Sequence, residues 1–181
     1  MSEVIERVIE LFDSTCEKQF ESMHCDIHSL NSAEYQKKGD SVCASINCYS
    51  DDIEITLIIT ATKGFLVNTI PLIGGQRLDT VSFQNDWCLE LANRFLGRLK
   101  NKLLSHDCLL NMGLPVLVGG SRQAQSSEDF SAKRVFQVDG LGENNQIQCA
   151  LGVTLLNPDM TLEDYEDEDE DWFDESELLH L

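Results

Sequence analysis

Three polar side chains at helical spacing, Asp86, Glu90 and Asn93, are the residues of this sequence best arranged for chemistry. On a helical wheel with Asp86 at the origin, Glu90 falls at about 40° and Asn93 at about 340°. Gly97, at about 20°, continues the same stripe. The apolar residues lie on the other side of the wheel, so two carboxylates and an amide are expected to face away from the core and meet a partner. A solvated polar face is the alternative, since amphipathic helices ordinarily carry one.

Cysteine and histidine offer a second kind of site. The sequence contains seven cysteines, and His24, Cys25 and His28 lie close together in it. Zn²⁺ prefers these residue types, but their spacing matches no recognised pair of zinc knuckles. Cys43 and Cys48, five positions apart on an expected strand, point to opposite faces. A cysteine nucleophile needs a nearby histidine and positive surroundings, which the sequence does not fix. We therefore expect buried thiols and no metal held by this chain.

The polar stripe belongs to the strongest helical signal in the chain, residues 84–104. Its apolar residues recur at spacings of three and four: Cys88, Leu89, Ala92, Phe95, Leu96, Leu99 and Leu103. The same pattern predicts an amphipathic helix over residues 3–21. A short helix is expected over residues 65–70, ending before Pro71.

Alternation of apolar and polar residues predicts strands over 42–49 and 53–61, joined by turn residues 50–52. Two further strands are expected over 134–139 and 146–156, with a glycine-containing hairpin link between them. Strands joined by hairpin-length turns, with long helices outside them, indicate an α+β fold. In this fold an antiparallel β-sheet packs with long amphipathic helices.

No helix or strand is predicted for two other segments. Residues 109–118 are apolar but are interrupted at Gly113 and Pro115, and residues 123–129 are polar and typical of a loop. Both lie between the long helix and the last pair of predicted strands.

Negative charge is concentrated at the C-terminus. The chain has 181 residues, with 32 acidic and 13 basic side chains and a net charge of -19. Residues 159–181 contain 12 of the acids and no Lys or Arg. The sequence thus divides into a mildly acidic domain, residues 1–158, and an acidic tail, residues 159–181. The tail is either a solvated segment or, through Trp172 and Phe173, an anchor for a groove.

Charge and hydropathy also exclude several classes of function. A strongly negative protein repels phosphates, so neither nonspecific nucleic-acid binding nor attachment to an anionic membrane is expected. No apolar run approaches the roughly 18 residues that a membrane span needs. The odd number of cysteines, and an N-terminus without the pattern of a secretory leader, indicate a reduced cytoplasmic protein.

The polar stripe and its neighbours resemble the signature helix of the CheX/CheC chemotaxis phosphatases. The matching residues are Asp86, Glu90, Asn93, Gly97 and Lys100. In that family a Pro follows the Asn at the start of a later strand, and here Pro115 lies 22 positions after Asn93. The expected order of elements over residues 1–157 matches as well. The resemblance implies a CheC/CheX-like fold.

The resemblance also implies an activity, which is hydrolysis of the aspartyl phosphate of a CheY-like response regulator receiver domain in chemotaxis or two-component signalling. Asn93 would orient the attacking water, and Glu90 would pair with a receiver Lys beside the phosphate. Asp86 would be a secondary contact to the partner. The Mg²⁺ ion belongs to the receiver, so this chain is expected to bind no cofactor. CheX-like proteins are often dimers, so a homodimer is implied by analogy.

One departure separates the two branches of that family. The CheC branch carries a second acid/amide pair on its first helix, whereas the first helix here offers Glu10 with Asp13, and Glu21 with His24, but no Asn at that spacing. The single pair is closer to CheX. The alternative function is a non-catalytic module that binds receivers or other proteins through the same helix face or through the acidic tail.

Overall fold

The computed structural model describes residues 2–23, 27–30, 40–71, 80–119, 130–138 and 145–163. Three helices and seven strands follow one another along these residues. They are α1 (Glu3–Ser22), β1 (Ile27–Leu30), β2 (Ser41–Tyr49), β3 (Ile53–Thr62), α2 (Lys63–Thr69), α3 (Val81–Ser105), β4 (Asn111–Met112), β5 (Val116–Leu117), β6 (Ala132–Val138) and β7 (Gln146–Leu155). The α+β fold class predicted from the sequence is confirmed.

All strands belong to one antiparallel sheet. Its order is β1-β6-β7-β3-β2-β4, and β5 pairs with β2 beside β4. The turn between β2 and β3 is closed by local bonds, because the Ser50 amide donates to the Ile53 carbonyl at 2.9 Å and the Ser50 hydroxyl accepts from the Asp52 amide at 3.2 Å. β6 and β7 pair antiparallel, as predicted, and the predicted glycine-containing link between them lies outside the described residues.

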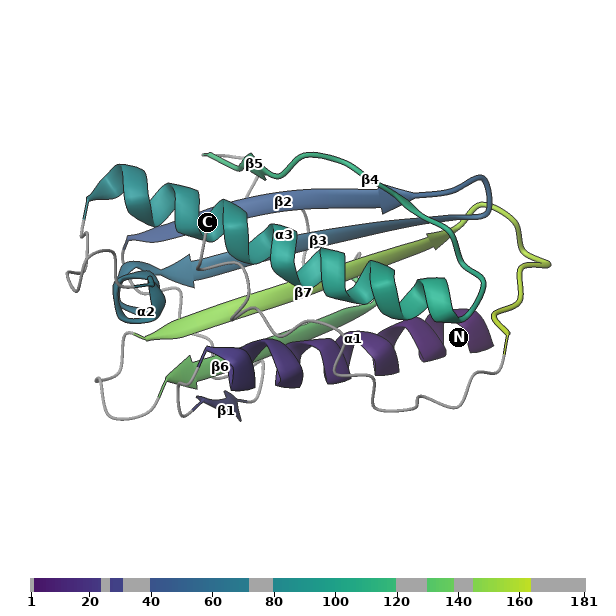
Figure 1. Cartoon of the computed structure of the whole chain (residues 1–181), viewed down its shortest axis with the longest axis horizontal. Helices are drawn as coiled ribbons and strands as arrows, with labels where there is room; N and C mark the ends of the chain where they lie inside the picture. The colour runs from purple at the N-terminus through teal and green to yellow at the C-terminus, as the bar shows by residue number, and fades with distance from the viewer. Residues whose placement is uncertain are drawn as a thin grey trace, which may run out of the picture.

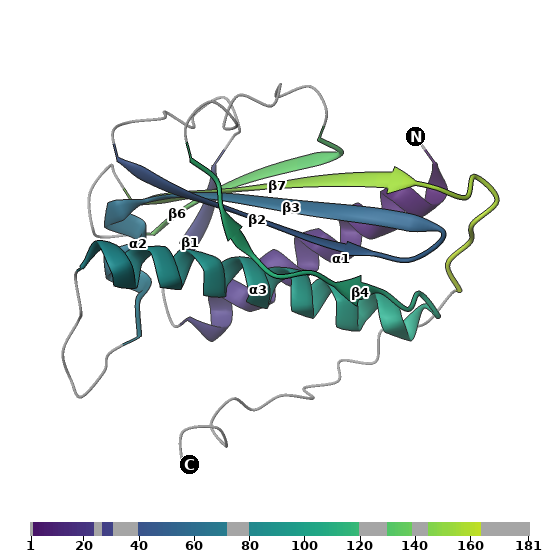
Figure 2. The same ribbon diagram turned by 90° about the horizontal axis from the view of Figure 1, so that it is seen from above.

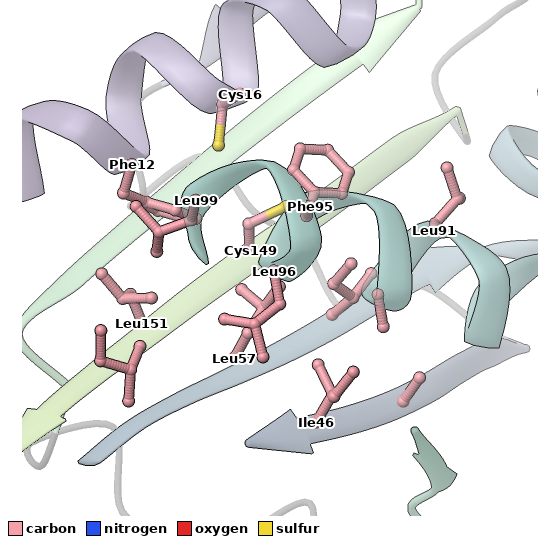
Figure 3. Packing of buried hydrophobic residues seen from close by; sticks show 14 of the residues in the cluster. Phe12, Cys16, Ile46, Leu57, Leu91, Phe95, Leu96, Leu99, Cys149 and Leu151 are labelled. Carbon is pink, nitrogen blue, oxygen red and sulfur yellow. The ribbon is translucent and has the colours of Figure 1, made fainter. Parts of the chain in front are cut away.

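The two long helices, α1 and α3, lie side by side on one face of the sheet (Figures 1 and 2). β3 shows the corresponding alternation: Ile55, Leu57 and Ile59 are buried, and the residues between them are only partly so. Figure 3 shows Phe12 of α1 and Phe95 of α3 above the strands, in the layer where the core lies. The sheet therefore has one face that is covered by helices.

Local hydrogen bonds and backbone conformation explain where α3 begins and ends. At its start, the Thr80 hydroxyl accepts a hydrogen bond from the Phe83 amide at 3.4 Å, which caps the first turn. At its end, Asp107 adopts a left-handed conformation with φ of 57°, and the Cys108 amide bonds back to the Leu103 carbonyl at 3.0 Å. α3 buries one stripe against the sheet and α1: Gln84, Trp87, Cys88, Leu91, Ala92, Phe95, Leu96, Leu99 and Leu103.

The segment after β7 stays on the body. Met160 and Leu162 pack against the core, and Glu163 bonds to His106 at the end of α3 through the Glu163 amide and the His106 carbonyl, at 3.3 Å. Packed residues thus continue past the predicted domain boundary at residue 158.

Most of the predicted elements are present with small shifts at their ends, including all three helices and the four long strands. β1, β4 and β5 were not predicted. β4 and β5 have two residues each and are separated by Gly113, Leu114 and Pro115, so the segment lacks a strand-like alternation. The loop predicted at 123–129 and the acidic block after residue 163 lie outside the described residues.

Within the residues that the structure describes, no helix is both apolar and long enough to cross a bilayer.

The cysteines support a prediction about pH. The six cysteines among the described residues are free and buried, as expected: Cys16, Cys43, Cys48, Cys88, Cys108 and Cys149. Burial raises the pKa of Cys48 and of Cys88 from 9.0 to about 12. The folded state holds these protons after the unfolded chain has released them, so their contribution to stability is complete below pH 9 and is lost as the pH rises towards 12.

We therefore expect the free energy of unfolding to fall above pH 9, by up to about 1.4 kcal/mol per pH unit for each such thiol. Urea unfolding at several pH values between about 8 and 11 measures this slope. Cys88→Ala should have a shallower slope than the wild type. An equal slope in the two proteins would contradict the assignment to Cys88.

Candidate functional site

The polar stripe of α3 faces outward, as the helical wheel predicts. Asp86 is exposed, and Glu90 and Asn93 are partly exposed on the next two turns. The opposite side of the helix is buried, and Figure 3 shows Leu96 and Leu99 directed into the core. A rigid helix of 25 residues therefore presents the two carboxylates and the amide together. We call Asp86, Glu90, Asn93 and Gly97 the polar stripe.

Glu90 is held by an arginine one turn further along. Arg94 Nε donates to Glu90 Oε1 at 2.7 Å, and the exposed fractions of the two side chains are 31% and 45%. An ion pair at this exposure adds little stability, but it favours a carboxylate position beside Arg94. A carboxylate accepts several hydrogen bonds, so Glu90 keeps acceptor capacity for a cationic partner while Arg94 is in place.

Arg94 is itself positioned by an indole ring. Its guanidinium carbon lies 5.4 Å from the centroid of the Trp87 ring, within the range of a cation–π contact. Trp87 Nε1 donates to Thr69 Oγ1 at 3.0 Å, and Thr69 Oγ1 donates to the Phe65 carbonyl of α2 at 2.8 Å. A series of contacts thus runs from the buried side of α2 through Trp87 and Arg94 to Glu90 at the surface.

Asn93 and Asp86 differ from Glu90 in their surroundings. Among the residues that the structure describes, no side-chain hydrogen bond or ion pair involves Asn93 or Asp86. Asn is a poor residue for a helix interior, at a cost of several tenths of a kcal/mol relative to Ala. No contact within the described body offsets that cost at Asn93. Its amide is available to water or to a partner.

Gly97 is a second residue of α3 that the fold itself does not require. A Cβ atom added at Gly97 would meet nothing within 4 Å. Glycine inside a helix destabilises it by roughly 0.5–1 kcal/mol relative to alanine. The empty space at Gly97, one turn after Asn93, therefore leaves the helix backbone open to close approach from outside.

Pro115 comes directly before β5, in agreement with its expected place at the start of a strand. β5 pairs with β2 through Val116 and Ser45. Pro115 thus belongs to the edge of the sheet and not to the polar stripe of α3.

The first helix provides no second site of the same kind among its described residues. Glu10 pairs with Arg7 at 3.1 Å, and Asp13 pairs with Arg134 of β6 at 2.7 Å. Glu10 and Asp13 therefore each pair with an arginine of the body. His24, which stands where the family pattern would place an Asn after Glu21, lies outside the described residues.

The other candidate chemistry concerns metal and thiol groups. Within the described residues, no three His, Cys, Asp or Glu side chains are arranged to hold a metal ion. His24 and Cys25 lie outside these residues, and only the backbone of His28 is described. Burial, the largest effect, raises the pKa of Cys16, Cys48, Cys88 and Cys108, so these thiols are protonated and unreactive at neutral pH.

Sequence reasoning missed the residues that support Glu90. The spacing of Glu90 and Arg94, four positions apart on a helix, was a signal for their ion pair. The contact of Trp87 with Thr69 joins two helices and has no local signal.

Comparisons with known proteins agree with the fold. No protein-family model matches the sequence, and no curated protein matches it. Among solved structures, the chain is similar to the chemotaxis protein CheX from Vibrio vulnificus, with a TM-score of 0.65 and 14% identity, over 84% of this chain and 100% of that one. It is also similar to a chemotactic CheC-like protein from Shewanella oneidensis, with a TM-score of 0.59 and 16% identity, over 81% and 97% of the two chains.

A third similar structure is a complex of CheX with CheY, BeF3 and Mg²⁺ from Borrelia burgdorferi. Its TM-score is 0.57 and its identity 13%, over 80% of this chain and 96% of that one. The chain described above thus has the α+β fold of the CheX and CheC-like chemotaxis proteins. The expectation of a CheC/CheX-like fold is confirmed.

Gly97 gives a direct test of whether the stripe is shaped for something outside the body. Gly97→Ala is expected to raise the free energy of unfolding by roughly 0.5–1 kcal/mol, because helix propensity improves and the new methyl group meets no atom. Urea unfolding measures the change, and Gly113→Ala is the control, since a Cβ there would lie 3.4 Å from the Asn47 carbonyl oxygen. Destabilisation by Gly97→Ala would show that the glycine serves the fold.

Proposed function

We propose that this protein hydrolyses the aspartyl phosphate of a CheY-like receiver domain in chemotaxis or two-component signalling. The observation that carries the proposal is the outward placement of Glu90 and Asn93, one turn apart on a rigid helix. The fold, shared with CheX and CheC-like proteins, supports it. The solved complex of a CheX with CheY supports the choice of partner.

Asn93 is the residue that we assign to the attacking water. Hydrolysis of an acyl phosphate requires a water in line with the scissile bond, and much of the rate comes from holding it there. The amide oxygen accepts a hydrogen bond from the water, and the amide group stays neutral throughout. The absence of a competing side-chain bond to Asn93 among the described residues suits this role.

Glu90 is the residue that we assign to docking. A receiver active site contains a Lys beside the phosphate, and a charge-assisted bond from that Lys to Glu90 would fix the register of the two proteins. Arg94 keeps the carboxylate in position before the partner arrives. Asp86, two turns before Asn93, provides a further polar contact at the edge of the same surface.

The divalent ion of the reaction belongs to the receiver in this proposal. The residues of the stripe are two carboxylates and an amide spread over about two turns of one helix, which suits contact with a partner surface. Chemistry at the phosphate thus requires both proteins, and we place this one in the cytoplasm with its substrate. It would act as a hydrolase with no cofactor of its own.

The test compares two asparagines of the same helix. We expect wild-type protein to accelerate the decay of a phosphorylated CheY-like receiver with Mg²⁺, and Asn93→Ala to lower kcat roughly 100-fold, because a misplaced water costs about that factor. Asn101→Ala is the matched control, since Asn101 is exposed on α3 beyond the stripe. Circular dichroism verifies that all three proteins are folded.

The outcomes separate the two hypotheses. Turnover that is equal in Asn93→Ala and Asn101→Ala would remove Asn93 from the mechanism. Saturable binding of the receiver, with no change in phosphate lifetime in any of the proteins, would support the alternative of a non-catalytic binding module.

The proposal includes a homodimer, which the exposed edge of the sheet supports. Apolar side chains gather there on β2 and on the β4–β5 segment: Tyr49, Leu109, Met112, Leu114, Val116 and Leu117. Leu114 is 87% exposed, and β4 and β5 are too short to cover the whole length of β2. Exposed apolar edges of this kind favour association.

Light scattering tests the dimer. Leu114→Asp combined with Val116→Asp is expected to reduce the mass of the particle in solution from two chains to one. Two carboxylates on this edge oppose its burial in an interface. Leu156→Asp is the control, since Leu156 is 55% exposed after β7. A wild-type mass of one chain at all concentrations would overturn the proposed homodimer.

A further inference from the structure

A row of basic side chains runs along α3, and two of them reach across to α1. Arg94, Arg98 and Lys102 lie four positions apart on α3, so they share one side of that helix. Arg98 Nη2 donates to Ser22 Oγ at 3.3 Å, and Lys102 Nζ donates to Ser14 Oγ at 2.8 Å. Both acceptors belong to α1, so this side of α3 faces its neighbour.

α1 adds a fourth cation to the row. Lys18 is exposed and lies midway between Ser14 and Ser22, one turn from each. We call Lys18, Arg94, Arg98 and Lys102 the basic seam. It contains four of the 13 Lys and Arg residues in the chain. In a protein with net charge -19, the seam gathers positive charge on one surface, which attracts an anionic segment.

The described chain ends beside the seam. His106 Nδ1 and the Glu163 carbonyl oxygen lie 2.7 Å apart, and the Glu163 amide donates to the His106 carbonyl at 3.3 Å. His106 follows Lys102 by four positions, so Glu163 leaves the body one helical turn from the end of the seam. Met160 and Leu162, packed against the core, fix this exit point.

The segment that follows has the complementary charge. Residues 164–181 contain ten Asp or Glu residues and no Lys or Arg, with Trp172 and Phe173 between two groups of acids. Because one end is tied to the body, the local concentration of these acids at the seam is high even if each contact is weak.

The reach of the acidic segment also matches the distance along α3 from His106 to Glu90. An extended chain advances about 3.3 Å per residue, so residues 164–171 reach about 26 Å from Glu163. Along α3, at 1.5 Å per residue, Glu90 lies about 24 Å before His106. An acidic segment lying along the seam would therefore bring Trp172 and Phe173 to the level of the polar stripe.

We infer that residues 164–181 dock on the basic seam of their own chain and bring Trp172 and Phe173 beside Glu90 and Asn93. There the segment competes with a protein partner for the polar stripe. Arg94 connects the two surfaces, since it belongs to the seam and also holds Glu90 at 2.7 Å. The docking stands on the seam and the exit point alone, whereas the competition rests on the proposed function.

Carbodiimide cross-linking of the full chain tests the docking without any partner. This reagent joins a Lys directly to a carboxylate in contact with it. In monomeric product, we expect peptides that join Lys18 or Lys102 to acids of residues 164–171. Their yield should fall several-fold when salt is raised from about 0.05 to about 0.5 M, because exposed ion pairs are screened.

Two single substitutions on α3 provide the matched comparison. Arg98→Gln removes one positive charge from the seam, and Lys100→Gln removes one from a neighbouring side of the helix; neither alters Lys18, Lys102 or the acids. Arg98→Gln should lower the cross-link yield several-fold and Lys100→Gln should leave it unchanged, with melting curves showing both folded. Absence of these cross-links in the wild type, or equal yields in the two variants, would overturn the docking.

A receiver assay separates this inference from the proposed function. Neutralising Glu166, Asp167 and Glu168 as Gln, Asn and Gln should lower KM for a phosphorylated receiver by roughly threefold or more, with kcat unchanged. Neutralising Asp174, Glu175 and Glu177 removes the same charge beyond the seam and should have a smaller effect. An equal KM in both variants would overturn the competition. Cross-links without any receiver turnover would retain the docking and reject the phosphatase.

Discussion

Burial of one side of α3 against the sheet is the interaction on which the rest of the arrangement depends. Phe95, Leu96 and Leu99 are almost fully buried there, and loss of such a side chain to Ala typically costs about 2–5 kcal/mol. With that side fixed, the rotation of the helix is fixed as well, and the polar stripe must face outward. The orientation of Glu90 and Asn93 therefore follows from apolar packing on the other side of the same helix, without any bond that the two side chains make themselves.

The same packing explains why a helix is a suitable base for this site. For the proposed hydrolysis, a rigid element holds the amide more accurately than a loop does, and the barrier is sensitive to that accuracy. The contacts from Thr69 through Trp87 and Arg94 extend the rigidity to the Glu90 carboxylate. Asn93 and Gly97, in contrast, each carry a cost in helix propensity that no contact in the described body offsets. Residues that weaken a helix locally are expected where function and not folding sets the choice.

The sequence predicted what depends on local periodicity and left out what depends on contacts between distant segments. The apolar repeat over residues 84–104 was sufficient for both α3 and its outward stripe, and alternation was sufficient for β2, β3, β6 and β7. β4 and β5 are defined by their pairing with β2, and no pattern within residues 109–118 predicts that pairing. The Trp87 contact with Thr69 and the packing of Met160 and Leu162 likewise arise from tertiary structure. The roles proposed for Glu90 and Asn93 depend on a family resemblance, because spacing alone does not distinguish a reactive stripe from a solvated one.

In the proposed function, the polar stripe of α3 is the surface that meets a receiver. The most direct measurement is the change in backbone amide chemical shifts of the full chain when a CheY-like receiver is added with BeF3 and Mg²⁺. We expect the largest changes at Asp86, Glu90, Asn93 and Gly97, and we expect them to weaken when BeF3 is omitted. Changes confined to the β1–β6 edge of the sheet, or equal changes with and without BeF3, would contradict it.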